Sequence, residues 1–129
     1  MESKALDRIF LLIASLSGGL AVALGAFGAH ALQDRVTAER LVTWETANRY
    51  HFYHTLALLA VAWAVTRLPE SGLPVSAGWL MLVGTLIFSG SLYLLVLSGR
   101  GWLGAITPIG GLALIAGWLC LALAAWSAR

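Results

Sequence analysis

The sequence predicts an all-α integral membrane protein, an antiparallel four-helix transmembrane bundle with one interfacial amphipathic helix leading into the second span. Three observations predict this class. The composition is 60% hydrophobic and only 11% charged, with a mean hydropathy of +0.85, whereas soluble domains have about 25% charged residues. The charged residues divide the chain into four long uncharged runs. A chain of 13.7 kDa has too much surface for its volume to hide this many apolar side chains from water.

Each uncharged run is long enough to form most or all of a membrane span. The runs cover residues 9–33, 50–66, 71–99 and 101–128. As a helix the first is about 37 Å long, which exceeds a hydrocarbon core of about 30 Å. Backbone amides in lipid are paired within their own segment, so each run is expected to be helical. We therefore expect one membrane domain over residues 1–129, with spans near 9–32, 50–67, 76–98 and 103–127.

The connection before the second span reads as a helix rather than as a loop. Residues 34–49 contain six of the fourteen charged residues but no Pro or Gly. Thr37 is a suitable N-cap, and Glu39 then falls in the first turn, where the helix dipole favours an acid. Apolar residues recur at helical spacing through Trp44. We expect an amphipathic helix over 38–49 that lies at the interface and continues into the second span.

Prolines mark the starts of the last two helices. Pro69 and Pro74 prevent a continuous helix between the second and third spans. Pro108 has two interpretations. It either kinks a helix that begins near residue 103, or occupies the first turn behind Thr107 as the N-cap. We favour the second, because it still leaves residues 107–126 for a span.

Small residues form faces on the first and fourth helices. Ala21, Gly25 and Ala29 repeat at intervals of four, and the fourth helix carries Gly110, Gly111 and Gly117. Because lipid provides little hydrophobic drive between helices, small residues favour close backbone packing. We expect these faces to pack within the bundle, with a ligand path beside the glycines and self-association through the same faces as the alternatives.

Four motifs occur in a fixed order along the chain. They are GAFGAHAL over residues 25–32, WETANRYHFYH over 44–54, FSGSLY over 88–93, and ITPIGG over 106–111 followed by Gly117 and Trp118. In this order and spacing they resemble the domain of unknown function 423 family, which includes bacterial inner-membrane proteins and the animal transmembrane protein 256. The resemblance covers nearly the whole chain. It implies a small multi-span membrane protein and assigns no biochemical role.

Polar side chains gather at one expected membrane face and form the candidate site. The members are His30, Glu45, Asn48, Arg49, His51, Tyr53, His54, Tyr93 and Arg100. Polar groups at a span are costly unless paired, so such a cluster is a candidate site. Three interpretations stay open: a structural polar clamp, a transition-metal or haem site that uses His30, His51 and His54, and contact with a quinone or lipid head group. We favour the clamp, with no metal or cofactor.

The sequence argues against several function classes. It has no nucleophile–base pair at recognisable spacing, no phosphate-binding loop and no HExxH motif, so we expect no enzyme. A net charge of +2 is too small to suggest a nucleic-acid partner. No expected span carries Asp, Glu, Lys or Arg at its centre, which disfavours ion-coupled transport.

We therefore expect a non-enzymatic accessory or assembly component of a membrane complex. The alternatives are a metal- or haem-binding redox accessory and a small oligomeric transporter. The expected partners are the lipid bilayer and other membrane proteins, or a second copy that packs through the Gly/Ala faces. The expected location is the bacterial plasma (inner) membrane as a multi-pass protein. Basic residues are equally divided between the two sides, but Lys4 and Arg8 beside the first helix favour cytoplasmic termini.

Overall fold

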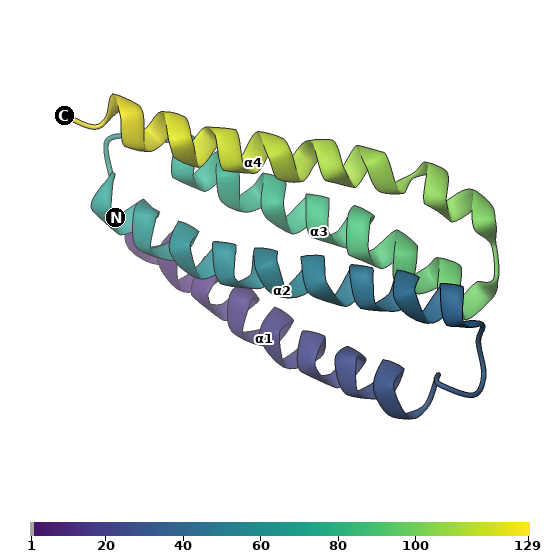
Figure 1. Ribbon diagram of the computed structural model, residues 1–129. Coiled ribbons are helices and arrows are strands. Elements are labelled where there is room, and N and C mark those ends of the chain that lie inside the picture. The colour runs from purple at the N-terminus through teal and green to yellow at the C-terminus, as the bar shows by residue number, and fades with distance from the viewer. Residues whose placement is uncertain (1) are drawn as a thin grey trace.

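Four long helices account for most of the chain. The computed structural model describes the backbone of residues 2–129 and the side chains of residues 4–129. The helices are α1 (Glu2–His30), α2 (Ala38–Arg67), α3 (Leu73–Ser98) and α4 (Thr107–Ser127), and a 3₁₀ turn, η1 (Gly101–Ala105), precedes α4. Residues 2–129 contain no strand, so the predicted all-α class is confirmed. Figure 1 shows the helices side by side, with both chain termini at one end, here called the termini end.

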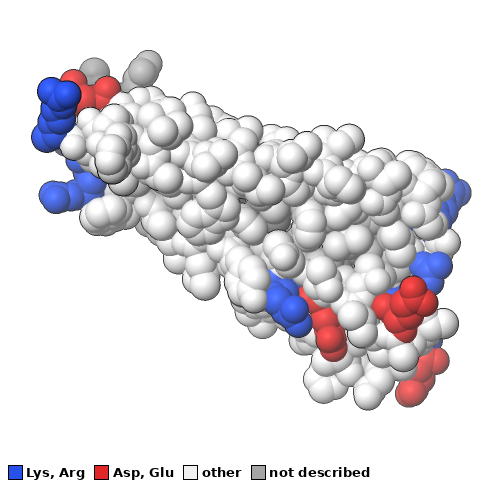
Figure 2. Space-filling model, turned by 45° about the horizontal axis from the view of Figure 1, so that its top comes forward, with Lys and Arg blue, Asp and Glu red and all other residues white. Residues whose placement is uncertain are grey.

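Three helical segments are long and apolar enough to cross a membrane. They cover Lys4–His30, Leu73–Ser98 and Gly101–Ser127. Helix α2 lies outside this group, because charged residues occupy its first turns and polar residues its middle. Figure 2 shows where the charged side chains lie on one face of the molecule. They lie toward the two ends, and a broad uncharged region separates them. These features identify a helical membrane protein.

Helix α2 begins much earlier than the expected second span. Thr37 is its N-cap, as predicted, because the Arg40 N–H donates to Thr37 Oγ1 at 3.3 Å. The stretch 38–49 forms the first turns of α2 itself, and no separate surface helix precedes it within the described residues. Trp44 is 2% exposed and Ala47 fully buried, so this stretch packs into the bundle.

The start of α4 confirms one expectation and corrects another. Pro108 lies in the first turn of α4, as expected, and residues 101–105 form η1 instead of the first turn of a span. Thr107, however, is not the N-cap: Ile106 occupies that position, without a side-chain cap. The Thr107 hydroxyl lies 2.6 Å from Ser91 Oγ on α3, so it joins two helices. A buried hydroxyl without a hydrogen-bond partner costs more free energy than an uncapped helix end that water can reach.

Small residues of α1 pack against α2, with a spacing that differs from the predicted one. Gly18 faces Thr55, Gly25 faces Asn48, and Gly28 lies against the Trp44 indole, where a Cβ would overlap the ring. Ala29 is exposed, so the expected ladder of Ala21, Gly25 and Ala29 is wrong at its last member. With the buried Ala21, these glycines recur at intervals of three or four residues and so lie on one face of α1.

Glycines also bring α3 and α4 together. A Cβ on Gly84 would lie 2.8 Å from a Leu114 methyl, and one on Gly117 would lie 2.8 Å from Met81 Cγ. A Cβ on Gly110 would overlap the backbone of α3 at Phe88. The glycine faces are therefore used within the chain.

Two apolar cores lie toward opposite ends of the bundle. The core at the termini end includes Phe10, Leu58, Val61 and Met81. The other includes Leu32, Trp44, Ala47, Tyr93 and Val96. Large apolar side chains also cover the outside, among them Leu16 and Leu86, each 66% exposed, as a surface in contact with lipid requires.

Candidate functional site

A chain of hydrogen bonds joins three helices between the two cores. Tyr93 OH on α3 lies 3.1 Å from Asn48 Nδ2 and 3.0 Å from His51 Nδ1, both on α2. His51 Nε2 lies 2.9 Å from Ser17 Oγ on α1, which in turn lies 2.7 Å from Thr55 Oγ1 on α2. We call these five side chains the polar network. His51 and Thr55 are each 5% exposed, so most of the network is shielded from lipid.

The network lies deep in the bundle. We had expected these residues at one membrane face. Ser17 is at the middle of α1, which runs from residue 2 to residue 30. Because His51 bonds to Ser17, its ring is at the same depth. We expected the second span to begin near residue 50, which put His51 at its edge, whereas α2 begins at Ala38 and is already in its fourth turn at His51.

Small residues of α1 make room for the polar atoms of α2. The Asn48 amide donates to the Ala21 carbonyl at 2.8 Å, and Gly25 adjoins the same amide. Trp44 donates from Nε1 to the Leu24 carbonyl at 2.8 Å. Backbone carbonyls of α1 are reached only because the facing residues are small, which is how helix pairs in membranes combine close packing with hydrogen bonds.

The need of the Tyr93 hydroxyl for an acceptor favours one tautomer of His51 and, with it, one direction of proton donation through the network. Asn48 Nδ2 gives its two hydrogens to the Ala21 carbonyl and the Tyr93 oxygen. If His51 also donated to that oxygen, the Tyr93 hydroxyl would lack an acceptor among the described contacts. Tyr93 therefore donates to His51 Nδ1, and His51 donates from Nε2 to Ser17. In this direction Ser17 donates to Thr55.

His54 belongs to a second, separate pair. Trp118 on α4 donates from Nε1 to His54 Nε2 at 3.1 Å. An indole nitrogen only donates, so Nε2 is the acceptor and the proton is on Nδ1. Nδ1 donates to the Tyr50 carbonyl at 2.8 Å. His54 is thus a neutral imidazole with both nitrogens paired, 4% exposed, joining α2 to α4.

The structure brings together only some of the predicted site residues. Asn48, His51 and Tyr93 meet as expected, while His54 lies in its own pair. The remaining members have exposed side chains and are not part of the network: His30, Glu45, Arg49, Tyr53 and Arg100. The part of the chain that the structure describes contains no group of three His, Cys, Asp or Glu side chains placed to hold a metal. The three histidines therefore do not converge.

Sequence reasoning missed the hydroxyl partners. Ser17, Thr55 and Ser89 complete the contacts, and Ser89 donates to the Ala47 carbonyl at 2.7 Å. A signal for Ser17 was available, because it lies four residues before Ala21, on the helix face that carries the small residues. Its pairing with a histidine 34 positions later depends on the register of α1 against α2.

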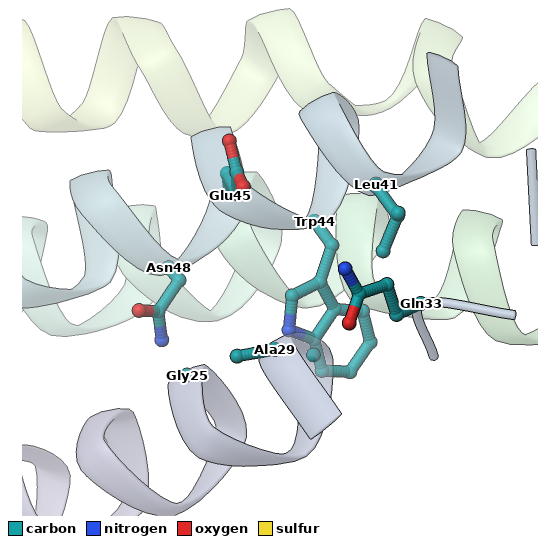
Figure 3. A pocket seen from close by; sticks show the side chains of 8 residues that line it. Gly25, Ala29, Gln33, Leu41, Trp44, Glu45 and Asn48 are labelled. Atoms are coloured by element: carbon teal, nitrogen blue, oxygen red, sulfur yellow. The ribbon is translucent and has the colours of Figure 1, made fainter. Parts of the chain in front are cut away.

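A small pocket opens at the α1–α2 contact near the end opposite the termini. Its volume is about 280 Å³, and it is lined by Gly25, Gly28, Ala29, Gln33, Leu41, Trp44, Glu45 and Asn48. In Figure 3 the side chains of Trp44 and Asn48 point from α2 toward α1. Glu45 is exposed at the rim. Glu45 is the one acidic residue in the lining of this pocket.

Apolar helices around a buried polar network define a small helical integral membrane protein. Comparison with known proteins gives its family. The model described as "Protein of unknown function (DUF423)" matches residues 24–111, and the chain belongs to this family. The UPF0382 membrane protein YwdK of Bacillus subtilis is 43% identical over 118 residues, which cover 92% of this chain and 96% of that protein. A UPF0382 membrane protein of Staphylococcus epidermidis is 42% identical over 119 residues, or 91% and 94% of the two chains. No solved structure matches.

Proposed function

We propose that the chain is a non-enzymatic accessory component that stabilises or helps to assemble a membrane complex, built as an antiparallel bundle of four spans. The observation that carries the proposal is the internal pairing of the polar groups. Among the described residues, every buried side-chain nitrogen or oxygen has a hydrogen-bond partner. A fully paired network fixes the register of the helices, and this is the behaviour of a structural clamp. It supports a scaffold more than a reaction centre.

The fourth span of the proposal is α2. Its polar side chains lower its hydropathy, but they face neighbouring helices, as the contacts of Asn48, His51 and His54 show. Polar residues in spans are tolerated on such inward faces. At 30 residues α2 is about 45 Å long, so its middle turns can cross the hydrocarbon while its charged ends extend into the interface. We therefore propose that residues 38–49, the first turns of α2, are the amphipathic segment at the interface.

The partners of this component are the bilayer and other membrane proteins. The glycine faces are occupied within the chain, so contact with a partner uses the aliphatic and indole surfaces at the two edges, α1 and α4. Helix α4 exposes Leu112, Ile115, Trp118, Leu119, Leu123 and Trp126. No cofactor, metal or nucleic acid is part of the proposal. The relatives in Bacillus and Staphylococcus support a bacterial plasma membrane, and Lys4 and Arg8 support cytoplasmic termini.

The redox alternative is weaker on geometry. A metal or haem iron needs imidazole nitrogens with free lone pairs. His51 and His54 each use both ring nitrogens in contacts with other residues, and His30 is exposed. Ligation of iron or copper would first break one hydrogen bond on each of these two rings. The oligomeric transporter stays an alternative without an observation in its favour.

Site-specific cross-linking in cells tests the accessory role. A photoreactive amino acid at Leu119 on α4, or at Leu16 on α1, samples the two edges, and both positions are exposed. We expect one edge to give a single discrete adduct with another membrane protein, confirmed by mass spectrometry and by co-purification in mild detergent. The same probe at Leu86 on α3 is a control for random collision. Equal, diffuse labelling from all three positions would contradict the proposal.

A further inference from the structure

A groove lies between α1 and α3, and members of the polar network form its floor. Its volume is about 380 Å³, within the range of small-molecule sites. Leu16, Leu20, Leu82 and Leu86 are among the wall residues, while Ser17, His51, Ser89 and Tyr93 contribute polar atoms. Leu16 and Leu86 are each 66% exposed, so the groove opens sideways toward lipid. We call it the α1–α3 groove.

The groove is elongated along the helices. On α1 its wall extends from Ile13 to Leu24, and on α3 from Leu82 to Tyr93. At 1.5 Å per residue, each wall is about 16 Å long. This shape suits a molecule with a chain or an alkylated ring, and it is reached from the bilayer rather than from water.

The polar atoms on the floor offer acceptors and no spare donor. Ser89 and Thr85 each donate to a backbone carbonyl at 2.7 Å. In the favoured direction of the network, Tyr93 donates to His51, His51 to Ser17, and Ser17 to Thr55. Every hydrogen on these groups is therefore committed. Each hydroxyl oxygen keeps a lone pair, because it has two and accepts at most one hydrogen bond in these contacts.

We propose that the α1–α3 groove binds a membrane-soluble molecule that carries a hydroxyl group, an alcohol or a phenol on an apolar skeleton. Its hydroxyl donates to the free lone pair of a floor oxygen, for which Ser89 and Ser17 in the lining are the candidates. A ketone, an ether or a quinone brings only acceptors. Such an oxygen would be left unpaired away from water, which weakens binding by about tenfold or more. This site is independent of the accessory role, because it needs no protein partner.

Photoreactive probes test the proposal directly. The protein in lipid nanodiscs is labelled with a diazirine derivative of 4-octylphenol or with its methyl ether, which differs only in the donor hydrogen. We expect the phenol to label the groove walls at a concentration about tenfold lower than the ether does. Competition by unlabelled 1-tetradecanol would assign the groove to aliphatic alcohols, and competition by 4-octylphenol alone would assign it to phenols. Equal labelling by phenol and ether would overturn the proposal.

Two glycines provide a matched pair of variants. Gly90 lines the groove and Gly19 lies on the exposed surface of α1, and a Cβ at either position meets no neighbour within 4 Å. Gly90→Leu fills the groove and is expected to abolish the phenol label, while Gly19→Leu keeps it. Ser89→Ala, which leaves the groove open, is expected to reduce the preference for phenol over ether. Equal labelling of Gly90→Leu and Gly19→Leu would overturn the assignment, as would adducts spread over the outside of α4.

Discussion

Replacing Tyr93 with phenylalanine removes one oxygen from the centre of the polar network. The ring keeps its packing against Trp44, whose centroid is 4.6 Å away, so the change isolates the hydroxyl. Two interhelical bonds disappear, from Asn48 at 3.1 Å and to His51 at 3.0 Å. Such bonds in membrane proteins contribute about 0.6 kcal/mol on average and up to about 1.7 kcal/mol each. We therefore expect Tyr93→Phe to lower the free energy of unfolding by about 1–3 kcal/mol.

The measurement is equilibrium unfolding in bicelles, followed by helical circular dichroism. Tyr53→Phe is the matched control, because Tyr53 is 51% exposed and outside the network, and it should change the free energy by less than about 0.5 kcal/mol. A double-mutant cycle with Ser17→Ala adds a second check. Because His51 links the two hydroxyls, the effects should be non-additive. Strict additivity, or a Tyr93→Phe effect no larger than the control, would refute the network as a stabilising unit.

Three further predictions concern packing, the second histidine and a helix end. Gly28→Ala should destabilise the bundle by about 2 kcal/mol or more, because a Cβ there overlaps a buried indole; Gly19→Ala, in open space, should be neutral or slightly stabilising in the same unfolding assay. His54→Leu leaves the Trp118 indole N–H unpaired and should lower the free energy of unfolding by about 1–3 kcal/mol, whereas His54→Asn should lower it by less. A bound metal ion that both variants lose equally would contradict the structural clamp. Arg40→Ala should lower the free energy of unfolding by about 1 kcal/mol, because this guanidinium donates to two carbonyls at the end of α3 at 2.8 and 3.3 Å. The control is Arg35→Ala, at an exposed position, and equal stability of the two variants would count against the contact.

The amino-acid pattern predicted the helices better than their contacts. Four uncharged runs and the N-cap at Thr37 were sufficient to predict four helices and the start of α2. The depth of the site was not predictable in the same way. His51 looked interfacial because Glu45 and Arg49 precede it, yet both of these side chains are exposed while His51 is buried. One helix can carry charged residues on an exposed face and polar residues on a buried face. The sequence alone does not show which face is buried, because this depends on where the neighbouring helices pack.

Partners far apart in the sequence were the part that could not be predicted. The preference of His54 for Trp118 depends on the packing of α4, and the close approach of α4 to α3 depends on Gly110 meeting the backbone at Phe88. Gly110 was recognised as a packing residue, but the sequence does not say which surface it meets. Likewise, Thr107 has the composition of an N-cap residue, and only the position of Ser91 shows why its hydroxyl turns to α3 instead.

The inward polar face of α2 has a consequence for how the protein enters the membrane. A segment is released from the translocon into lipid according to its apolarity, and buried polar groups in α2 lower that tendency for the helix on its own. Its nearest preceding helix offers the Ser17 hydroxyl and the Ala21 carbonyl as ready partners. The first two helices are therefore expected to insert together as a hairpin, with α1 waiting at the translocon until α2 has been synthesised. Tyr93 arrives only with α3, so the hairpin stays incompletely paired until the third helix is made.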